Sequence, residues 1–304
     1  MTLTGPSTPV STTAGSLTIA GRLNADAGTV GNGGTIRANS EKTLVTGHLS
    51  AEGGSTSGNG GFIETSGKTL TIAPSTTVST RAPKGTKGTW LLDPANLEVV
   101  GAGGAATVAL ANGSVADSTI AASTIVTALD GNNVDLQATN SITVSAAINA
   151  SGNAGTGNLT LTAPTSNLNA PITLKPGSTL NGTAAIVNVG AGGTVQNGVD
   201  AALAGGTVNL AAATYTLAQE VGINKDITIK GTAANKTTVS GNSTVRVFNV
   251  ASGNVTLDSM SIVNGSTTAN GAGIQNANGA TLNINNITVA DNTGTNLSRE
   301  KQCR

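Results

Sequence analysis

The sequence is poor in aromatic, charged and sulfur-containing residues. Of 304 residues, 1% are aromatic and 10% are charged, and the only cysteine is Cys303. A core with so few rings must be built from Val, Ile, Leu and Ala. A single cysteine excludes an intrachain disulfide. Because 15 basic residues balance 15 acidic ones, no net field would gather nucleic acid or anionic lipid, and we expect no nucleic-acid partner.

Long apolar runs are absent as well. No stretch approaches the roughly 20 apolar residues that a membrane helix needs, so we expect no membrane-spanning segment. Residues 1–15 have neither the basic nor the apolar region of a signal peptide. We therefore expect either a cytosolic protein or a piece of a longer chain.

What the sequence does contain is a series of short apolar clusters bounded by Gly and Asn. Examples are LTIA (17–20), VDLQ (134–137) and ITIK (227–230). Alternation of β-branched or aliphatic residues with polar ones is typical of strands. Disordered chains are usually poorer in β-branched residues. The sequence therefore predicts an all-β protein.

The clearest signal is an internal repeat. GNGGTIR (31–37), GNGGFIE (58–64) and GTKGTWL (85–91) follow one another at equal intervals, 58 − 31 = 27 and 85 − 58 = 27. A period of this length with two or three short strands suits one winding of a parallel β-helix, in which windings stack about 4.8 Å apart. Gly and Asn would form the corners, where φ is positive.

A similar spacing occurs near the end of the chain. The interval between the starts of VTLDSM (255–260) and TLNINN (281–286) is 281 − 255 = 26. The interval between the start of ITIKG (227–231) and that of VTLDSM is 255 − 227 = 28. We expect these segments to stack in the same way.

Two segments depart from the strand pattern. The first is 117–131, for which we expect a helix with Asp117 as N-cap and Gly131 beyond its end. Its apolar residues at near-helical spacing are Ile120, Ile125 and Leu129.

The second is 194–206, which also predicts a short amphipathic helix. Val195, Val199, Ala202 and Leu203 fall at i, i+4, i+7 and i+8. Such a helix could cover the open end of a β-helix and protect its unpaired edge. We expect a boundary between modules near residues 190–195.

The stretch from Gly21 to Val100, with GNGGFIETSGK and WLLDP, resembles the filamentous haemagglutinin-type exoproteins, the large adhesins of two-partner secretion in Gram-negative bacteria. The segments 128–152 and 157–174 look like the repetitive shaft of such proteins. The resemblance implies a secreted or cell-surface location and an outer-membrane two-partner secretion transporter as partner. The family's amino-terminal secretion domain and a carboxy-terminal effector domain do not appear, which leads us to expect a fragment, an internal start or a truncated gene.

From about Val195 onward the sequence is similar to the right-handed β-helix modules of bacterial surface proteins and polysaccharide lyases. The segments that carry this similarity are GGTVNLAAATYTL, INKDITIKG and GNVTLDSMSIVNG. The predicted fold is thus all-β, a right-handed parallel β-helix (solenoid) with one or two short capping or inserted helices. The predicted domains are a haemagglutinin-type shaft segment (1–190), a second, pectate-lyase-like β-helix module (191–295) and an irregular tail (296–304).

Few residues could form a catalytic or metal site. His48 is the only histidine, and Ser75, which follows it by one repeat of the glycine pattern, looks like an ordinary surface residue. Zinc needs several Cys or His ligands, and calcium-binding β-rolls need aspartates that the GNGG segments lack. We predict no catalytic residue, no metal ligand and no cofactor.

A polysaccharide lyase remains the enzymatic alternative, since such enzymes need carboxylates for calcium and a base. The nearest residues are Asp226, Lys230, Arg246 and Asp258, which read equally well as outward-facing polar positions.

The WLLDP segment holds the remaining distinctive residues. Trp90 and Leu92 share one face of a strand and are expected to point inward. Trp90 in a binding role is the alternative. Asp93 is expected to cap a turn that begins at Pro94.

The predicted function is a non-enzymatic, structural and adhesive segment of a bacterial exoprotein, a rigid rod for host or cell contact with an unidentified receptor or glycan. Two alternatives stay open. One is a polysaccharide-acting or glycan-binding β-helix protein, and the other is a scaffold region of a contact-dependent toxin-delivery exoprotein.

Overall fold

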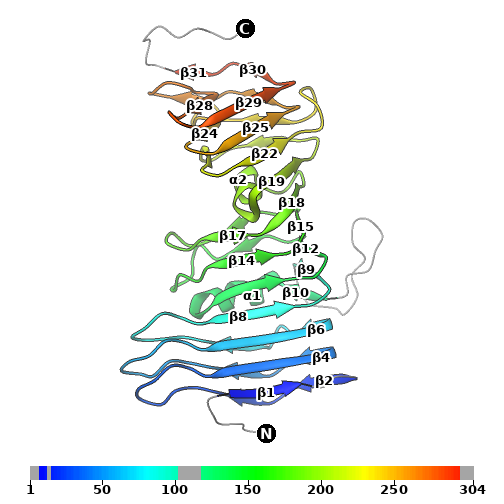
Figure 1. The fold of residues 1–304 in the computed structure, drawn as a ribbon, viewed down its shortest axis with the longest axis vertical. Helices are drawn as coiled ribbons and strands as arrows, with labels where there is room; N and C mark the ends of the chain where they lie inside the picture. Colours follow the sequence, from blue (N-terminus) through cyan, green and yellow to red (C-terminus); the bar gives the residue numbers. More distant parts are fainter. Residues whose placement is uncertain (1–6, 12–14, 102–117, 295–304) are drawn as a thin grey trace. The chain divides into compact units, whose positions relative to one another are not determined.

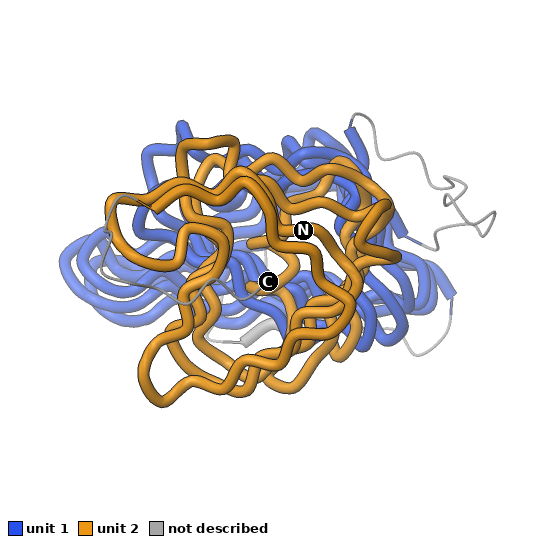
Figure 2. The backbone as a smooth tube through the Cα atoms, turned by 90° about the horizontal axis from the view of Figure 1, so that it is seen from above, with its two compact units in different colours: residues 1–184 blue, residues 185–304 orange. Residues whose placement is uncertain are grey.

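The computed structural model describes residues 7–11, 15–101 and 118–294, which form 31 strands and two helices (Figure 1). The prediction of an all-β protein is confirmed. The chain divides into two compact units, unit 1 (residues 1–184) and unit 2 (residues 185–304), shown in different colours in Figure 2. The boundary expected near residues 190–195 lies slightly beyond the end of unit 1 at residue 184. The identities assigned to the two modules stay predictions.

The first half of unit 1 contains β1 (Ser7–Ser11), β2 (Ser16–Ile19), β3 (Arg22–Asn24), β4 (Thr35–Val45), β5 (His48–Ser50), β6 (Phe62–Ile72), β7 (Thr77–Ser79), β8 (Thr89–Asp93) and β9 (Asn96–Val100). Its second half contains β10 (Thr119–Ala121), α1 (Ala122–Gly131), β11 (Asn133–Gln137), β12 (Ser141–Val144), β13 (Ile148–Asn149), β14 (Leu159–Thr162), β15 (Thr165–Leu168), β16 (Ile172–Thr173) and β17 (Leu180–Gly182).

Unit 2 begins within β18 (Ala184–Val189) and continues with α2 (Val195–Ala201), β19 (Ala202–Leu210), β20 (Thr214–Thr216), β21 (Val221–Ile223), β22 (Ile227–Lys230), β23 (Thr238–Ser240) and β24 (Phe248–Val250). It ends with β25 (Asn254–Asp258), β26 (Ser261–Val263), β27 (Ser266–Thr267), β28 (Ile274–Asn276), β29 (Thr281–Asn285), β30 (Thr288–Ala290) and β31 (Thr293–Gly294).

In the first half of unit 1, β4, β6 and β8 pair in parallel with the spacing that the glycine repeat predicts. Thr35 on β4 is aligned with Phe62 on β6, and Phe62 with Thr89 on β8, so the intervals between partners are 62 − 35 = 27 and 89 − 62 = 27. We call the chain between two such partners a winding. The strands at the two ends of such a winding are hydrogen-bonded to each other.

Unit 2 follows the same rule, with one correction. Ile227 is aligned with Val255, and this interval of 255 − 227 = 28 is the expected one. Val255, however, is aligned with Leu282, so the next interval is 282 − 255 = 27 rather than 26. The strand β25 begins at Asn254, one residue before the apolar pattern, and this accounts for the difference.

Buried aliphatic side chains form columns that run from winding to winding. In unit 1, Ile36, Ile63, Trp90, Val134 and Leu159 are successive partners, and each is at most 1% exposed. Burying each such side chain stabilises the fold by roughly 1.5–3 kcal/mol. The core therefore lies between the strand layers of each unit and is continuous along the stack.

Glycine in the GNGG segments meets two different needs. The first glycine of each, Gly31 and Gly58, has a positive φ of 121° and 127°, as the corner prediction requires. Gly61 is needed for another reason, because a Cβ there would lie 2.0 Å from the carbonyl oxygen of Gly34 on the previous winding. The backbones of neighbouring windings thus approach too closely for any side chain.

In unit 2 several corners use residues other than glycine. Ser259 and Asn286, separated by 286 − 259 = 27, have φ of 58° and 53°. Asn264 and Asp291, separated by 291 − 264 = 27, have φ of 51° and 54°. Asn and Asp tolerate this left-handed conformation better than most residues. Equivalent corners of successive windings therefore share one backbone conformation.

Helix α1 is shorter than the expected helix over 117–131. It begins at Ala122, and residues 119–121 form β10, which lies between β6 and β9 and pairs with both. Asp117, the expected N-cap, lies outside the described residues. Gly131 is the last helical residue, and Asn132 is the C-cap.

Helix α2 is also shorter than the range 194–206. Thr194 caps it, accepting a hydrogen bond from Asn197 N at 3.2 Å. The helix ends at Ala201, and residues 202–206 belong to β19, so this part of the prediction is wrong. The β-branched and glycine-rich run that follows favours a strand.

Candidate functional site

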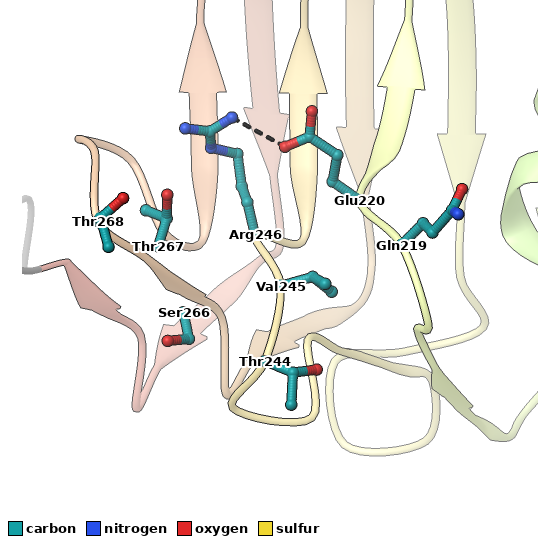
Figure 3. Close-up of a pocket in the computed structure, with 8 residues that line it drawn as sticks. All are labelled: Gln219, Glu220, Thr244, Val245, Arg246, Ser266, Thr267 and Thr268. Atoms are coloured by element: carbon teal, nitrogen blue, oxygen red, sulfur yellow. Dashed lines mark hydrogen bonds and ion pairs between the residues drawn. The ribbon is translucent and has the colours of Figure 1, made fainter.

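Unit 2 contains an open hollow of about 520 Å³ beside β21 and β24. Glu220 directly precedes β21 and Arg246 lies two residues before β24, so the parallel pairing of these strands brings the two side chains together. The rest of the wall includes four hydroxyl-bearing side chains, Thr244, Ser266, Thr267 and Thr268, together with Gln219 and Val245 (Figure 3). Three successive windings thus contribute to one surface.

The Arg246 guanidinium is fixed by three acceptors. Nη1 donates to Glu220 Oε2 at 2.8 Å, and Nε and Nη2 donate to the carbonyl oxygens of Gly271 and Asn270, each at 3.1 Å. Asn249 Nδ2 donates to the other carboxylate oxygen of Glu220 at 2.8 Å. The Arg246 side chain is 10% exposed and that of Glu220 39%. Charge-assisted hydrogen bonds of this kind hold both groups in one geometry.

This arrangement limits the chemistry of the hollow. The positive charge of Arg246 is matched by Glu220, so the pair exerts little net attraction on an anionic ligand. A guanidinium also stays protonated in proteins and cannot serve as a general base. The hydroxyls of Ser266 and Thr268 can both donate and accept hydrogen bonds, which suits a neutral polyhydroxyl ligand.

The structure brings only two of the four candidate lyase residues together. Lys230 Nζ lies 4.0 Å from Asp258 Oδ2, since the two residues are partners on β22 and β25. Asp226 instead accepts a hydrogen bond from the backbone N of Asn254 at 2.8 Å. Arg246 has the partners described above. The set does not form one cluster of carboxylates around a base.

Unit 1 has a second hollow, of about 270 Å³, between β5, β7 and α1, and His48 lines it. His48 Nδ1 hydrogen-bonds to Thr77 Oγ1, its direct partner in the parallel ladder. Ser75 is not the ladder partner of His48, and its hydroxyl donates to Thr46 O at 3.4 Å. The alignment of His48 with Ser75 is therefore wrong.

The error has a simple structural origin. The connection between β6 and β7 has four residues (73–76), whereas that between β4 and β5 has two (46–47). The interval at this corner is therefore 77 − 48 = 29 rather than 27.

Polar side chains next to His48 link three windings. Asp26 Oδ1 accepts hydrogen bonds from Ser50 Oγ at 2.5 Å and from Glu52 N at 2.7 Å, and Ser79 Oγ donates to Glu52 Oε1. These residues do not stand out in the sequence. The signal that could have found them is the winding register, which aligns positions 24, 50 and 79.

Three buried oxygen atoms have no hydrogen-bond partner among the described residues: Glu98 Oε2, Thr124 Oγ1 and Ser166 Oγ. Glu98 is 4% exposed, and its other carboxylate oxygen accepts a hydrogen bond from Ser145 Oγ at 2.5 Å. Thr124 lies on α1 and lines the His48 hollow.

Trp90 and Leu92 point inward, and both are fully buried, which confirms the prediction. The indole Nε1 donates to Thr65 Oγ1 at 3.0 Å. Trp90 therefore packs in the core of unit 1, at the inner border of the His48 hollow.

Asp93 belongs to an acidic row on the outer face of unit 1. Its Oδ2 accepts a hydrogen bond from Gln137 Nε2 at 3.3 Å. Burial, and then the charge of Glu64, raises the pKa of Asp93 above its ordinary value. Burial also raises the pKa of Asp135. The hydrogen bond from Thr162 opposes this rise, and the charge of Asp93 adds to it. Repulsion and burial both favour the protonated carboxyl groups here.

Within residues 7–11, 15–101 and 118–294, no three His, Cys, Asp or Glu side chains come together as metal ligands. In the same part of the chain, no helix is long and apolar enough to cross a membrane. Compared with protein-family models, curated proteins and solved structures, the sequence and fold give no significant match.

Proposed function

We propose that each unit is a right-handed parallel β-helix and that the chain is a structural, adhesive segment of a large secreted or cell-surface bacterial exoprotein. The observation that carries this proposal is the parallel, in-register pairing of successive windings around a column of buried and mostly aliphatic side chains. Such stacks gain their stability from contacts between neighbouring windings.

The physical features of the chain suit this role. Parallel pairing aligns β4, β6 and β8 residue by residue, and close backbone contacts at Gly58 and Gly61 leave little room for sliding. A stack of this kind resists bending and displays outward polar side chains in rows. The resemblance of residues 21–100 to haemagglutinin-type exoproteins adds the proposed location, the surface of a Gram-negative bacterium, and the proposed partner, an outer-membrane two-partner secretion transporter.

An adhesion assay tests the proposal. Beads coated with the full chain should attach to epithelial or bacterial cells, and an excess of soluble chain should compete. Beads coated with the heat-unfolded chain are the control, since adhesion by a folded surface should be lost. Equal attachment of native, unfolded and uncoated beads would reject the adhesive role.

The hydroxyl-lined hollow favours a second candidate function, the binding of a neutral glycan. A glycan array should then show neutral saccharides bound in preference to uronates, and Thr268→Val should weaken that binding. Thr228→Val on β22 is the matched control outside the hollow. Release of unsaturated uronate products by the wild-type chain would instead establish a lyase.

A further inference from the structure

A cationic hollow lies in unit 1 at the carboxyl end of α1, apart from the Glu220–Arg246 hollow. It measures about 240 Å³ and is lined by Arg81, Pro83, Gly85, Lys87, Asp130 and Gly131. The loop that connects β7 to β8 supplies the first four residues, and α1 supplies the last two. The hollow exists because parallel stacking places this loop against the end of the helix.

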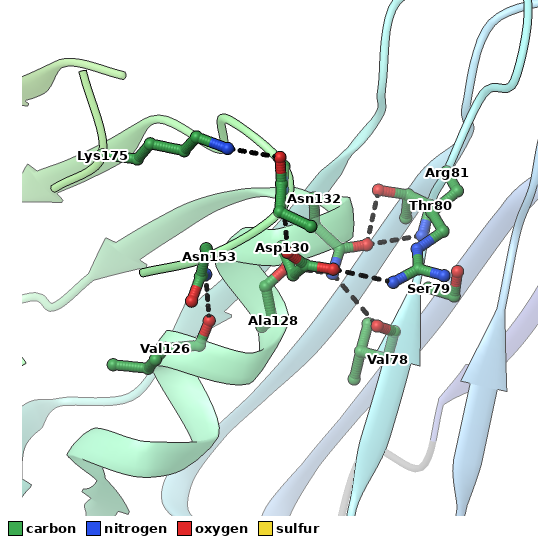
Figure 4. A network of polar contacts seen from close by, with 12 residues as sticks. Val78, Ser79, Thr80, Arg81, Val126, Ala128, Asp130, Asn132, Asn153 and Lys175 are labelled. Carbon is green, nitrogen blue, oxygen red and sulfur yellow. Dashed lines mark hydrogen bonds and ion pairs between the residues drawn. The ribbon is translucent and has the colours of Figure 1, made fainter. Parts of the chain in front are cut away.

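Positive charge exceeds negative charge at this place. The charges that act on Lys87 are those of Asp130, Arg81 and Lys175, so three cations face one carboxylate. The carboxylate is already engaged, since Asp130 Oδ2 lies 3.1 Å from Arg81 Nη2 and Asp130 Oδ1 accepts a hydrogen bond from Gly155 N at 2.8 Å (Figure 4). Among the described residues, Lys87 has no carboxylate within ion-pair distance.

The pKa of Lys87 lies below its ordinary value. Burial lowers it, and Arg81 and Lys175 lower it further, against the opposing charge of Asp130. A negatively charged group placed in the hollow would offset these effects and favour the charged ammonium.

Carbonyl oxygens at the end of α1 could repel an anion, but two of them are already paired. Ala128 O accepts from Asn132 N at 2.9 Å, and Leu129 O accepts from Gly157 N at 2.9 Å. Lys175 Nζ donates to Ala154 O at 2.5 Å, which holds its charge near the hollow (Figure 4).

The cations are also held in place by the packing around them. A Cβ at Gly131 would lie 2.6 Å from Arg81 Nε, so the lack of a side chain at Gly131 leaves room for the arginine at the helix end. Asn132 joins the helix to β7, because its Oδ1 accepts from Thr80 Oγ1 at 2.8 Å and its Nδ2 donates to Val78 O at 3.0 Å. These contacts fix the end of α1 against the loop that carries Arg81 and Lys87.

We propose that the hollow lined by Arg81, Lys87 and Asp130, with Lys175 beside it, binds an oxyanion, either free or as a group on a larger ligand. Phosphate, sulfate and carboxylate share the chemistry that a guanidinium and ammonium groups recognise. The site depends only on the fold of unit 1 and does not rest on the adhesive role.

The test is calorimetric titration of the full chain with inorganic phosphate at an ionic strength held constant with sodium chloride. We expect saturable binding, weakened at least fivefold in Lys87→Met and in Lys175→Met. The matched control is Lys68→Met, an exposed lysine on β6. Absence of saturable binding, or the same affinity in all three variants, would overturn the proposal.

A second readout uses the unmodified protein. Acetic anhydride reacts with neutral amines, so phosphate bound beside Lys87 should slow its acylation, measured by mass spectrometry, while Lys68 reacts at an unchanged rate. Equal slowing at both lysines would show a general salt effect and count against the site. Titrations with sulfate and acetate distinguish a tetrahedral from a planar oxyanion.

Discussion

The indole Nε1 of Trp90 donates a hydrogen bond to Thr65 Oγ1 at 3.0 Å, across two neighbouring windings, and both residues are fully buried. The direct partner of Trp90 in the ladder is Ile63, so the bond to Thr65 is diagonal. This contact gives the largest side chain of the core a polar partner within the stack.

Replacement of Trp90 by Phe should destabilise unit 1. The change leaves a cavity and removes the partner of a buried hydroxyl, and an unsatisfied buried polar group alone costs about 1–3 kcal/mol. Urea denaturation followed by circular dichroism measures the loss. The double variant with Thr65→Val should recover part of it, and strictly additive effects of the two changes would argue against the hydrogen bond.

Gly58→Ala should be much more harmful than an alanine at an open glycine. The new Cβ would lie 1.8 Å from Gly31 O at a residue with φ of 127°. Strain and overpacking together should cost about 2–5 kcal/mol. Gly152→Ala, where nothing lies within 4 Å, is the control and should change stability by at most about 0.5 kcal/mol. Similar melting temperatures for the two variants would contradict the close stacking.

Asp135→Asn should stabilise the protein near neutral pH. The folded-state pKa of Asp135 is raised above its ordinary value of 3.8. As the pH rises from 3.8 through the folded-state pKa, the carboxyl group ionises more readily in the unfolded chain, so the free energy of unfolding falls. Asparagine removes the charge and can still accept the hydrogen bond from Thr162. We expect a gain on the order of 0.5 kcal/mol.

The pH dependence checks the cause of this gain. Below pH 3.8 the carboxyl group is protonated in both folded and unfolded states, so the difference from wild type should disappear. A gain that stays constant across the acid range would assign the effect to packing. Glu41→Gln at an exposed position of β4 is the control.

Arg246→Met should destabilise unit 2 by about 1–3 kcal/mol, because it removes the partner of Glu220 and leaves the Gly271 and Asn270 carbonyls without this donor. Lys230→Met is the matched control. Its ion pair with Asp258 spans 4.0 Å and its side chain is 54% exposed, so the change should stay within about 0.5 kcal/mol. Equal melting temperatures for both variants would contradict the structural role of Arg246.

The sequence predicts the strand register well wherever the corner length is constant. The spacing of GNGG at 31 and 58 equals the alignment of β4 with β6, because identical corners impose identical windings. The inward orientation of Trp90 follows from strand alternation alone. The orientation of Trp90 is visible within one strand, and the register is visible once two windings with the same corner are compared.

Features that depend on a change in the number of residues between two strands cannot be predicted from the repeat. Two extra residues between β6 and β7 move Thr77 into the place beside His48. No local sequence pattern predicts that β10 pairs with both β6 and β9. Residues 119–121 adopt an extended conformation to make these pairs, so the first helix is shorter than expected.

The hollows are predictable only in part. Arg246 stands out in the sequence, but its partner Glu220 belongs to the previous winding and becomes its neighbour only through β21 and β24. Lys87 and Lys175 likewise come from separate windings. To predict sites of this type from sequence, the register of every intervening winding must be known.

Engineered disulfides test most directly whether windings stack in the register that the glycine repeat predicts. Lys42 and Thr69 are partners on β4 and β6. Their Cα atoms should therefore lie about 4.8 Å apart, within disulfide range. In a chain with Cys303→Ser, Lys42→Cys with Thr69→Cys should oxidise readily while the fold is retained. Lys42→Cys with Thr71→Cys, about 8 Å apart, should not. Equal cross-linking of the two pairs in the folded protein, or cross-linking of the second pair alone, would contradict the stacked register.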